Sequence, residues 1–282
     1  MPTDSAALES GVSAMASPDV ARGLELSRAA GWNQTEADWG MMLRLGAGYG
    51  ARDAEGRLVA SSIVLPYPPA IGWISMVLVD ESARRRGLAT RLLENAIAVL
   101  RKQGLVPMVD ATPAGREVYR RMGFVDVAPI SRWRGRGAGV SAQSRETSSA
   151  VELAAGIAQD EAAFGISRRP LLLELAGRRG AITLSLSDRR GQLWSRAGRT
   201  ATQIGPVVAA GEGDGLALCA MALDAMAGPV LLDVPDRNAP LADLLASRGF
   251  SIERPFIRMA LGVPSASTLG AAMRVIAGPE LG

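Results

Sequence analysis

The stretch ISMVLVDESARRRGLAT, residues 74–90, decides the fold of the first half of this chain. It joins an apolar, strand-like run to three arginines, a glycine and a run with helical periodicity. A helix N-terminus leaves four backbone N–H groups unpaired and carries about half a positive charge, so it binds anions, and a glycine lets them approach closely. Arginines beside the helix N-terminus add hydrogen bonds to a charged ligand, worth about 1.5 to 3 kcal/mol each. The stretch therefore predicts a diphosphate-binding turn between a strand and a helix.

The segments around this turn predict a mixed, mostly antiparallel sheet flanked by helices. Helices are expected over 18–30 and 35–45, followed by an antiparallel meander of strands. The helix after the turn carries its leucines on one face, which is typical of a helix packed on a sheet. The expected order is strands 48–52, 58–65 and 72–79, helix 87–102, strand 106–111, a short helix after Pro113, and strand 124–130.

The second half of the chain partly repeats this order. VDATPAGREVYRRMGF, residues 109–124, is echoed by LDVPDRNAPLADLLASRGF, residues 232–250: each is a buried strand ending in Asp, a proline-marked helix and a closing Gly-Phe. Between the halves, a stretch rich in Gly, Ser and Arg is typical of a linker. The predicted divisions are a disordered N-terminus at 1–17, a first domain at 18–134, a linker at 135–150, a diverged second domain at 151–262 and a docked tail at 263–282.

Composition excludes several classes of protein. The chain has 282 residues, 48% of them apolar and 21% charged, which suits two globular domains. No apolar run is long enough for a membrane span and no secretory signal is evident, so a soluble cytoplasmic protein is expected. A net charge of +3 is too mild to indicate a nucleic-acid partner. The chain has no histidine, so no metal site is expected, and its one cysteine, Cys219, lies in the apolar run ALALCAMAL.

The pattern Arg84-x-x-Gly87-x-Ala89 resembles the coenzyme A turn of the GNAT superfamily of N-acyltransferases, which reads Gln/Arg-x-x-Gly-x-Gly/Ala. The order of elements from Gly72 to Phe124 is also that of the superfamily. A Walker pattern and a GxGxxG motif are both absent. The competing interpretation is an ordinary basic surface turn. The resemblance implies an α/β (α+β) protein of two tandem GNAT-like domains, with acetyl-CoA or another acyl-CoA as co-substrate.

The resemblance also implies which residues bind the cofactor. The strand before the turn splays from its neighbour, and its backbone at Val77, Leu78 and Val79 pairs with the pantetheine arm. Thr112 stands where the family often has an asparagine, although it also suits a helix N-cap. The diphosphate is expected at the turn, on Arg84, Arg85, Arg86, Gly87, Leu88, Ala89 and Thr90.

Tyr119 is the predicted catalytic residue. It matches the tyrosine four residues before the glycine that, in many relatives, protonates the leaving thiolate. The alternative is a half-buried packing role. Without histidine, the base that accepts the amine proton is a carboxylate, a backbone carbonyl or a water chain, and the sequence does not identify it.

The acceptor pocket is expected at the loop between the first two helices. Trp32, Asn33, Glu36 and Trp39 suit a partly apolar amine, or the tryptophans simply anchor the helix pair.

The second half of the chain differs from the first at two positions, the phosphate-binding turn and the catalytic tyrosine. It reads AGEGDG where the phosphate turn should be, and acidic residues there repel an anion. Leu245 replaces the tyrosine. A degenerate second domain without its own cofactor is therefore expected.

These features predict an acyl-CoA-dependent N-acyltransferase that acts directly on a small-molecule amine. A non-catalytic acyl-CoA sensor and a protein lysine or N-terminal acetyltransferase are the alternatives. The residues leave open the acceptor, the acyl length and whether the chain is a monomer or a homodimer.

Overall fold

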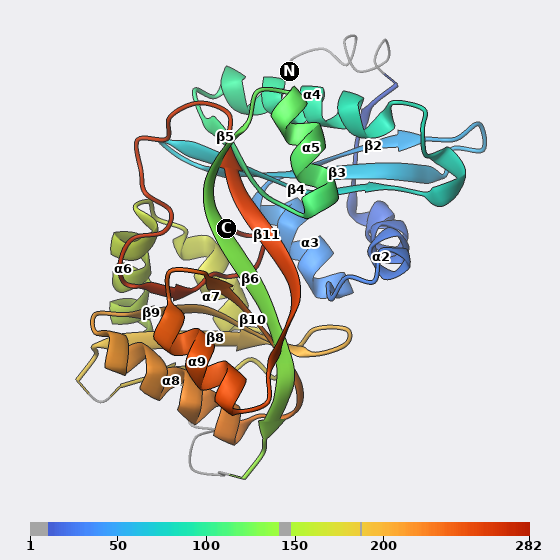
Figure 1. Ribbon diagram of the computed structural model, residues 1–282. Helices are drawn as coiled ribbons and strands as arrows, with labels where there is room; N and C mark the ends of the chain where they lie inside the picture. Colours follow the sequence, from blue (N-terminus) through green and yellow to red (C-terminus); the bar gives the residue numbers. More distant parts are fainter. Residues whose placement is uncertain (1–10, 141–147, 187) are drawn as a thin grey trace. The chain divides into compact units, whose positions relative to one another are not determined.

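The computed structural model describes residues 11–140, 148–186 and 188–282. The chain divides into two compact units, residues 1–109 and 110–282 (Figure 1).

The first unit contains a five-stranded sheet in the order β1-β2-β3-β4-β5. Neighbouring strands are antiparallel except for β4 and β5, which are parallel. Its elements are β1 (Ser13–Ala14), the 3-10 helix η1 (Ser17–Asp19), α2 (Val20–Ala29), α3 (Glu36–Leu45), β2 (Ala47–Arg52), β3 (Leu58–Tyr67), β4 (Ile71–Val79), the 3-10 helix η2 (Glu81–Ala83), α4 (Leu88–Lys102) and the start of β5 (Val106–Ala111).

Helices cover both faces of this sheet. A Cβ on Gly72 of β4 would meet Leu100 of α4, and a Cβ on Gly48 of β2 would meet Leu43 of α3, so glycines on the two faces let the helices approach closely. In Figure 1, α4 lies on one side of the strands and α2 and α3 lie on the other. The apolar face of α4 is buried as its periodicity predicts, at Leu92, Leu93, Ala96, Ile97 and Leu100.

The second unit contains a sheet in the order β11-β6-β10-β9-β8-β7, with β12 paired to β9. β9 and β10 are parallel, whereas β6 pairs antiparallel with β10 and β11, β8 with β7 and β9, and β12 with β9. Its elements are the end of β5, α5 (Pro113–Arg121), β6 (Val125–Ala138), α6 (Ala150–Phe164), α7 (Arg169–Ala176), β7 (Thr183–Ser185), β8 (Gly191–Arg196), β9 (Thr202–Ala209), α8 (Glu212–Ala225), β10 (Ala227–Pro235), α9 (Ala239–Ser247), β11 (Ser251–Ala260) and β12 (Met273–Val275).

Helices again lie on both faces of the sheet. A Cβ on Gly191 of β8 would touch Leu218 of α8, whereas Gln192, the next residue, lies against Gly156 of α6. Successive strand residues point to opposite faces, so α6 and α8 cover opposite sides. The predicted class, a mixed and mostly antiparallel sheet flanked by helices in each half, is confirmed.

The structure corrects three expectations about the segments between and outside the domains. Residues 135–138, expected as linker, are the end of β6 and pair with β10. Residues 13–14, expected to be disordered, form β1 on the edge of β2. The tail is not only docked but contains a strand, β12, that the sequence did not predict. Residues 1–10 and 141–147 of the predicted N-terminus and linker lie outside the described residues.

The boundary between the units also differs from the predicted one. It falls at Val109, inside β5, and not after β6. The reason is that β6, although it continues the first half of the sequence, lies between β10 and β11 of the second half. Hydrogen bonding on both edges makes it a central strand of the second unit.

Candidate active site

The first feature of the site is a divergence of two parallel strands. β4 and β5 pair only over Ile71–Trp73 and Val106–Met108. β4 continues to Val79, so its backbone after Trp73 has no strand partner on the β5 side among the described residues of this unit. A strand edge of this kind offers N–H and C=O groups to an extended ligand.

A β-bulge lies at the point of divergence. In the pairing with β3, Ser61 faces Leu78 and Ile63 faces Ser75, so Met76 and Val77 together oppose one residue. Met76 has a φ of 51°, in the left-handed region, and the Ser61 hydroxyl donates to its carbonyl at 2.8 Å. Bulges bend a strand and increase its twist, which accounts for the separation of β4 from β5. Of the residues expected to pair with pantetheine, Val77 is part of the bulge, and Leu78 and Val79 follow it on this free edge.

The second feature is the turn that joins β4 to α4. Arg85 has a φ of 62° and Gly87, the N-cap of α4, a φ of 74°. No side chain caps α4, and a Cβ on Gly87 would meet no atom within 4 Å. The first amides of α4, at Leu88, Ala89 and Thr90, therefore open onto free space beside the arginines.

The three arginines of the turn are exposed and held loosely. Arg84 Nε lies 3.4 Å from the Val79 carbonyl, and an Arg86 Nη2 donates to the Ser82 carbonyl at 3.1 Å. One depression is lined by Glu81, Ser82 and the three arginines. A second depression brings Arg52 and Arg91 to the side of Arg86 and Leu88.

Sequence analysis missed Arg52 and Arg91. Arg91 lies four residues after Gly87, one helical turn along α4, and that spacing could have indicated it. Arg52 comes from β2 and is brought there only by the fold.

Asp80 stabilises the start of the turn. Its carboxylate accepts hydrogen bonds from the hydroxyl and the backbone N–H of Ser82, at 2.7 and 3.0 Å, and it pairs with Arg22 of α2. The Ser82 hydrogen bonds, together with Arg22, lower the pKa of Asp80 to about 2. Asp80 is thus an anion that fixes the turn geometry.

Two predicted site residues lie in the second unit, on one face of α5. Thr112 is the N-cap of α5, and its hydroxyl accepts from the Gly115 N–H at 3.2 Å. A Cβ on Gly115 would lie 3.1 Å from the Tyr119 ring and 3.3 Å from the Thr112 hydroxyl, so the missing side chain lets the ring lie over the first turn of the helix. The Tyr119 ring also packs on Phe124, with centroids 5.5 Å apart. Burial raises the pKa of Tyr119 to about 12, so its proton stays in place at neutral pH.

The residues expected around the acceptor have different environments. Trp39 is fully buried: its ring lies 2.8 Å from a Cβ built on Gly23 of α2, and its Nε1 donates to Ser27 at 3.2 Å. Trp39 therefore anchors α3 to α2 and offers no surface to an acceptor. Trp32 is half-buried, Asn33 is buried and Glu36 is exposed in the first turn of α3.

Buried polar atoms mark candidates that the sequence did not reveal. Among the described residues, the hydroxyls of Ser62 and Ser75 and the amide oxygen of Gln34 are buried without a hydrogen-bond partner. Ser75 directly precedes the bulge of β4, and Gln34 lies in the loop between α2 and α3. Such atoms bind water or a ligand group, because an unpaired buried polar group is costly. Ser75 could have been noticed in the sequence, because it is the one polar residue in the apolar run ISMVLV.

The second unit has lost the corresponding features. The first turn of α8 carries Glu212 and Asp214, and the Asp214 carboxylate accepts from the N–H of the N-cap, Gly211. Leu245, in the place of the tyrosine, is fully buried in the core. Cys219 is buried in α8, and burial raises the pKa of its thiol to about 12.

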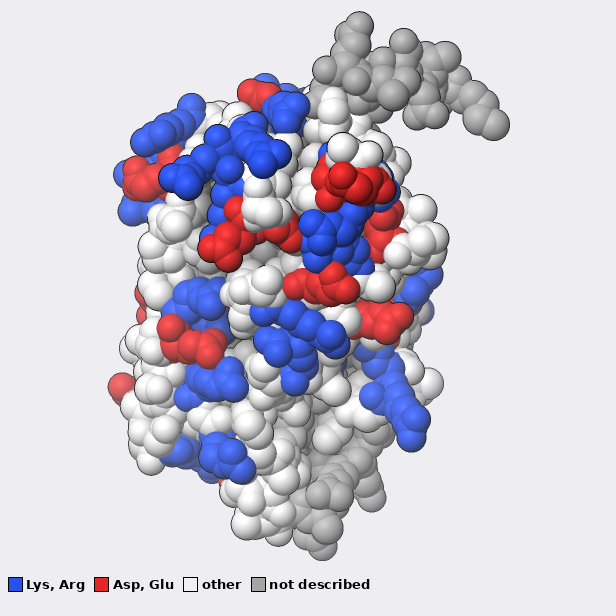
Figure 2. Space-filling view, turned by 90° about the vertical axis from the view of Figure 1, so that its right-hand side faces the viewer, with Lys and Arg blue, Asp and Glu red and all other residues white. Residues whose placement is uncertain are grey.

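Charge is mixed on the face shown in Figure 2, where basic and acidic side chains alternate. Within the described part of the chain, no group of three or more His, Cys, Asp or Glu side chains is placed to hold a metal ion. None of the described helices has the length and apolar character needed to cross a membrane.

Both halves match sequence models of one family. Residues 24–124 match the model described as "Acetyltransferase (GNAT) family", and residues 157–269 match a second one, "Acetyltransferase (GNAT) domain". No curated protein matches the chain.

Solved structures share the whole two-domain fold. A putative acetyltransferase from Pyrococcus horikoshii has a TM-score of 0.79 at 18% identity, over 96% of this chain and 95% of that one. A tandem GNAT protein from the clavulanic acid biosynthesis pathway has a TM-score of 0.62 at 15% identity, over 91% and 98%. A GCN5-related N-acetyltransferase from Sphaerobacter thermophilus has a TM-score of 0.56 at 14% identity, over 93% and 98%. At these identities, the likenesses show the fold.

Proposed function

Because this chain belongs to the GNAT acetyltransferase family and carries two of its domains, we propose that it transfers the acyl group of acetyl-CoA, or another acyl-CoA, directly to the primary amine of a small molecule. The observation that carries this proposal is the uncapped N-terminus of α4 beside the free edge of β4. The helix N-terminus offers backbone amides and arginines to a diphosphate. The edge of β4 offers strand hydrogen bonds to the amides of pantetheine.

Charge and shape both support a diphosphate at the turn. Gly87 leaves space for a phosphate within reach of the amides of Leu88 to Thr90. Arg84, Arg85 and Arg86 supply exposed cations around it, and Arg91 and Arg52, the latter paired with Asp19, line the adjoining depression.

The acyl-CoA supplies an activated thioester. The acceptor amine attacks the carbonyl carbon as the C–S bond breaks, and the Tyr119 phenol donates its hydrogen bond and proton to the departing sulfur. The products are an amide and a thiol, and a proton from solvent restores the phenol. Because the pKa of Tyr119 is about 12, the phenol is protonated whenever a thiolate departs.

The acceptor amine must lose a proton, and the chain has no histidine to take it. We assign this step to a water chain that begins at the Ser75 hydroxyl, which is buried and lacks a partner among the described residues. Water passes the proton to solvent without a dedicated base. Trp32, Asn33 and Glu36 are the proposed acceptor-binding residues, with the exposed Glu36 carboxylate attracting the cationic form of the amine.

A thermal-shift measurement with two probes tests the binding step. Acetyl-CoA at about 100 times its Kd should add about 2.7 kcal/mol of stability, whereas S-acetylpantetheine, which lacks the diphosphate, should give a much smaller shift. Thiol release over a panel of small amines then tests the transfer. Binding without release from any acceptor would identify a binding module, and release only with peptides would identify a protein acetyltransferase; either result refutes the proposal.

A further inference from the structure

The second unit repeats the strand divergence of the first. β9 and β10 pair only over Thr202–Ile204 and Val230–Leu232, although β9 continues to Ala209. The register against β8 also breaks at this point, because Gly205 and Pro206 together oppose Trp194. A gap between two parallel strands after a bulge is therefore present in both units.

In the second unit this gap is filled by the chain itself. β12 pairs antiparallel with β9, with Met273 opposite Val208 and Val275 opposite Val207. The Ala209 N–H donates to the Ala272 carbonyl at 3.0 Å on the β9 side. On the β10 side the Ile276 N–H donates to the Asp233 carbonyl at 3.0 Å. The segment thus bridges the two diverging strands.

The gap is shaped for this segment at Gly205. A Cβ at that position would lie 2.1 Å from the Ile276 carbonyl oxygen, and its φ of 143° suits glycine. Any side chain at residue 205 would displace the segment.

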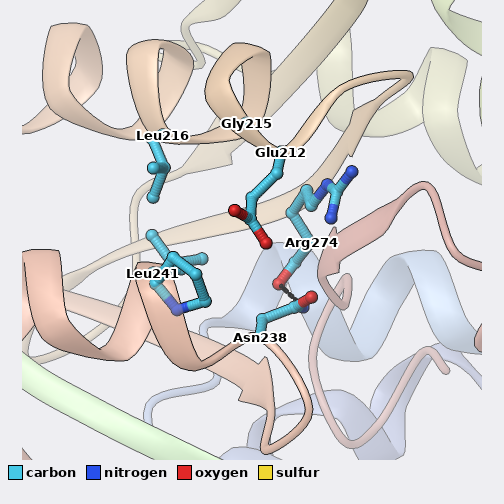
Figure 3. Close-up of a pocket in the computed structure, with 7 residues that line it drawn as sticks. Glu212, Gly215, Leu216, Asn238, Leu241 and Arg274 are labelled. Carbon is cyan, nitrogen blue, oxygen red and sulfur yellow. Dashed lines mark hydrogen bonds between the residues drawn. The ribbon is translucent and has the colours of Figure 1, made fainter.

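Polar side chains bind the segment along its length. Arg237 donates to the carbonyls of Leu269, Gly270 and Met273, and the Asn238 amide donates to those of Met273 and Arg274 at 3.2 and 2.9 Å. Figure 3 shows the bond from Asn238 to the Arg274 backbone.

Two buried arginines hold the end of the segment. Arg196 donates to the Ala277 carbonyl at 2.7 Å and to the Glu280 carboxylate at 2.6 Å. Arg168, which is itself paired with Asp160, donates to the Gly282 carbonyl. Release of the segment would break the buried pair between Arg196 and Glu280, which is costly, so the segment is anchored firmly.

The segment also contacts the first turn of α8. A Cβ on Gly215 would lie 2.7 Å from Arg274 Cγ, and the Glu212 carboxylate lies beside them (Figure 3). The N-terminus of α4 is open and surrounded by arginines, whereas that of α8 is acidic.

We propose that residues 269–282 are a built-in occupant of the second unit's strand gap, bound there as an added strand in place of a cofactor. The second unit is therefore closed to acyl-CoA, and the chain binds one acyl-CoA, in its first unit. The single-site statement rests on the proposed function, whereas the bound segment rests only on the geometry of the second unit.

Cleavage of the folded, full-length chain tests whether the segment is a bound ligand. A specific protease site placed at residues 262–265, where Val263 is 92% exposed, would be cut after folding. We expect the released piece to stay with the protein through gel filtration. Its loss, with the remaining chain still folded, would overturn the proposal.

A glycine pair provides the matched variants. In the cleavable chain, Gly205→Ala should speed release of the segment at least about tenfold, because its Cβ meets Ile276. Gly213→Ala, in α8 with no atom within 4 Å of the new Cβ, should leave release unchanged. If Gly205→Ala does not fold, Glu280→Gln, which weakens the pair with Arg196, replaces it and should also speed release. Equal release from all variants contradicts the proposal.

Calorimetric titration with acetyl-CoA tests the single site. We expect one acetyl-CoA per chain, and binding about 10- to 1000-fold weaker after Arg84, Arg85 and Arg86 are changed to Gln. Two molecules per chain would overturn the inference. No binding at all to the unmodified chain would refute the proposed function, while the cleavage experiment would still decide the role of the segment.

Discussion

Arg258 binds Asp110 through two hydrogen bonds of 2.8 Å, although 148 residues separate them in the chain. Both side chains are fully buried, and Arg258 also donates to Thr268 at the start of the tail segment. This pair ties the end of β5 to β11. It explains why Asp110 belongs to the second unit although its strand begins in the first.

Breaking this pair should destabilise the second unit strongly. We expect Arg258→Met to cost about 3 to 5 kcal/mol in urea unfolding, because it leaves a buried carboxylate without its partner. The double variant Asp110→Leu with Arg258→Met should cost less than this single change, since no charge remains buried. Arg179→Met, at an exposed position, is the control and should change stability by less than about 0.5 kcal/mol. A single variant as stable as the control would show that the pair contributes little.

The arginines of the turn should act on cofactor binding and not on chemistry. Changing Arg84, Arg85 and Arg86 to Gln should raise the KM for acetyl-CoA about 10- to 1000-fold with little change in kcat, because the lost interactions are present in both ground and transition states. High salt should weaken binding to the original chain more than to the variant. Arg101→Gln, exposed at the other end of α4, is the matched control. An unchanged KM would show that these arginines belong to an ordinary basic surface turn and do not bind the cofactor.

Tyr119→Phe should lower kcat about 100- to 10,000-fold while the KM for acetyl-CoA stays nearly constant. The ring remains to pack on Phe124, so the thermal unfolding midpoint should hardly move. The pKa of Tyr119 is raised to about 12, and the acid must be protonated to act, so the phenol should cause no loss of activity between pH 7 and about 11. A variant with normal kcat would assign Tyr119 to packing.

Cys219 should take no part in the reaction. Its buried thiol, with a pKa of about 12, is almost entirely protonated at neutral pH, and only a thiolate reacts readily. We expect a thiol reagent to modify it only after unfolding, and Cys219→Ala to keep full kcat. Formation of an acetylated protein from acetyl-CoA alone, absent in Cys219→Ala, would instead indicate transfer through the cysteine.

Local features of the structure followed from the sequence because their causes are local. The apolar period of α4, the Thr35–Asp38 capping box of α3 and the proline at the start of α5 each act within one or two helical turns. The turn at Arg84 to Gly87 was found for the same reason, since its chemistry lies in a few consecutive residues. Arg52, by contrast, reaches the turn from another strand and carries no signal of its own.

The sequence by itself determined two copies of an α/β pattern, the arginine-rich turn before α4 and the acidic residues that replace it before α8. Only the tertiary structure decided that β6 lies between β10 and β11, and that residues 273–275 fill a gap in the second sheet. Strand pairing depends on backbone groups that every residue carries, so the sequence of a strand says little about its neighbours. Which edges meet is settled by packing and by buried pairs such as Asp110 and Arg258, whose partners lie far apart in the chain.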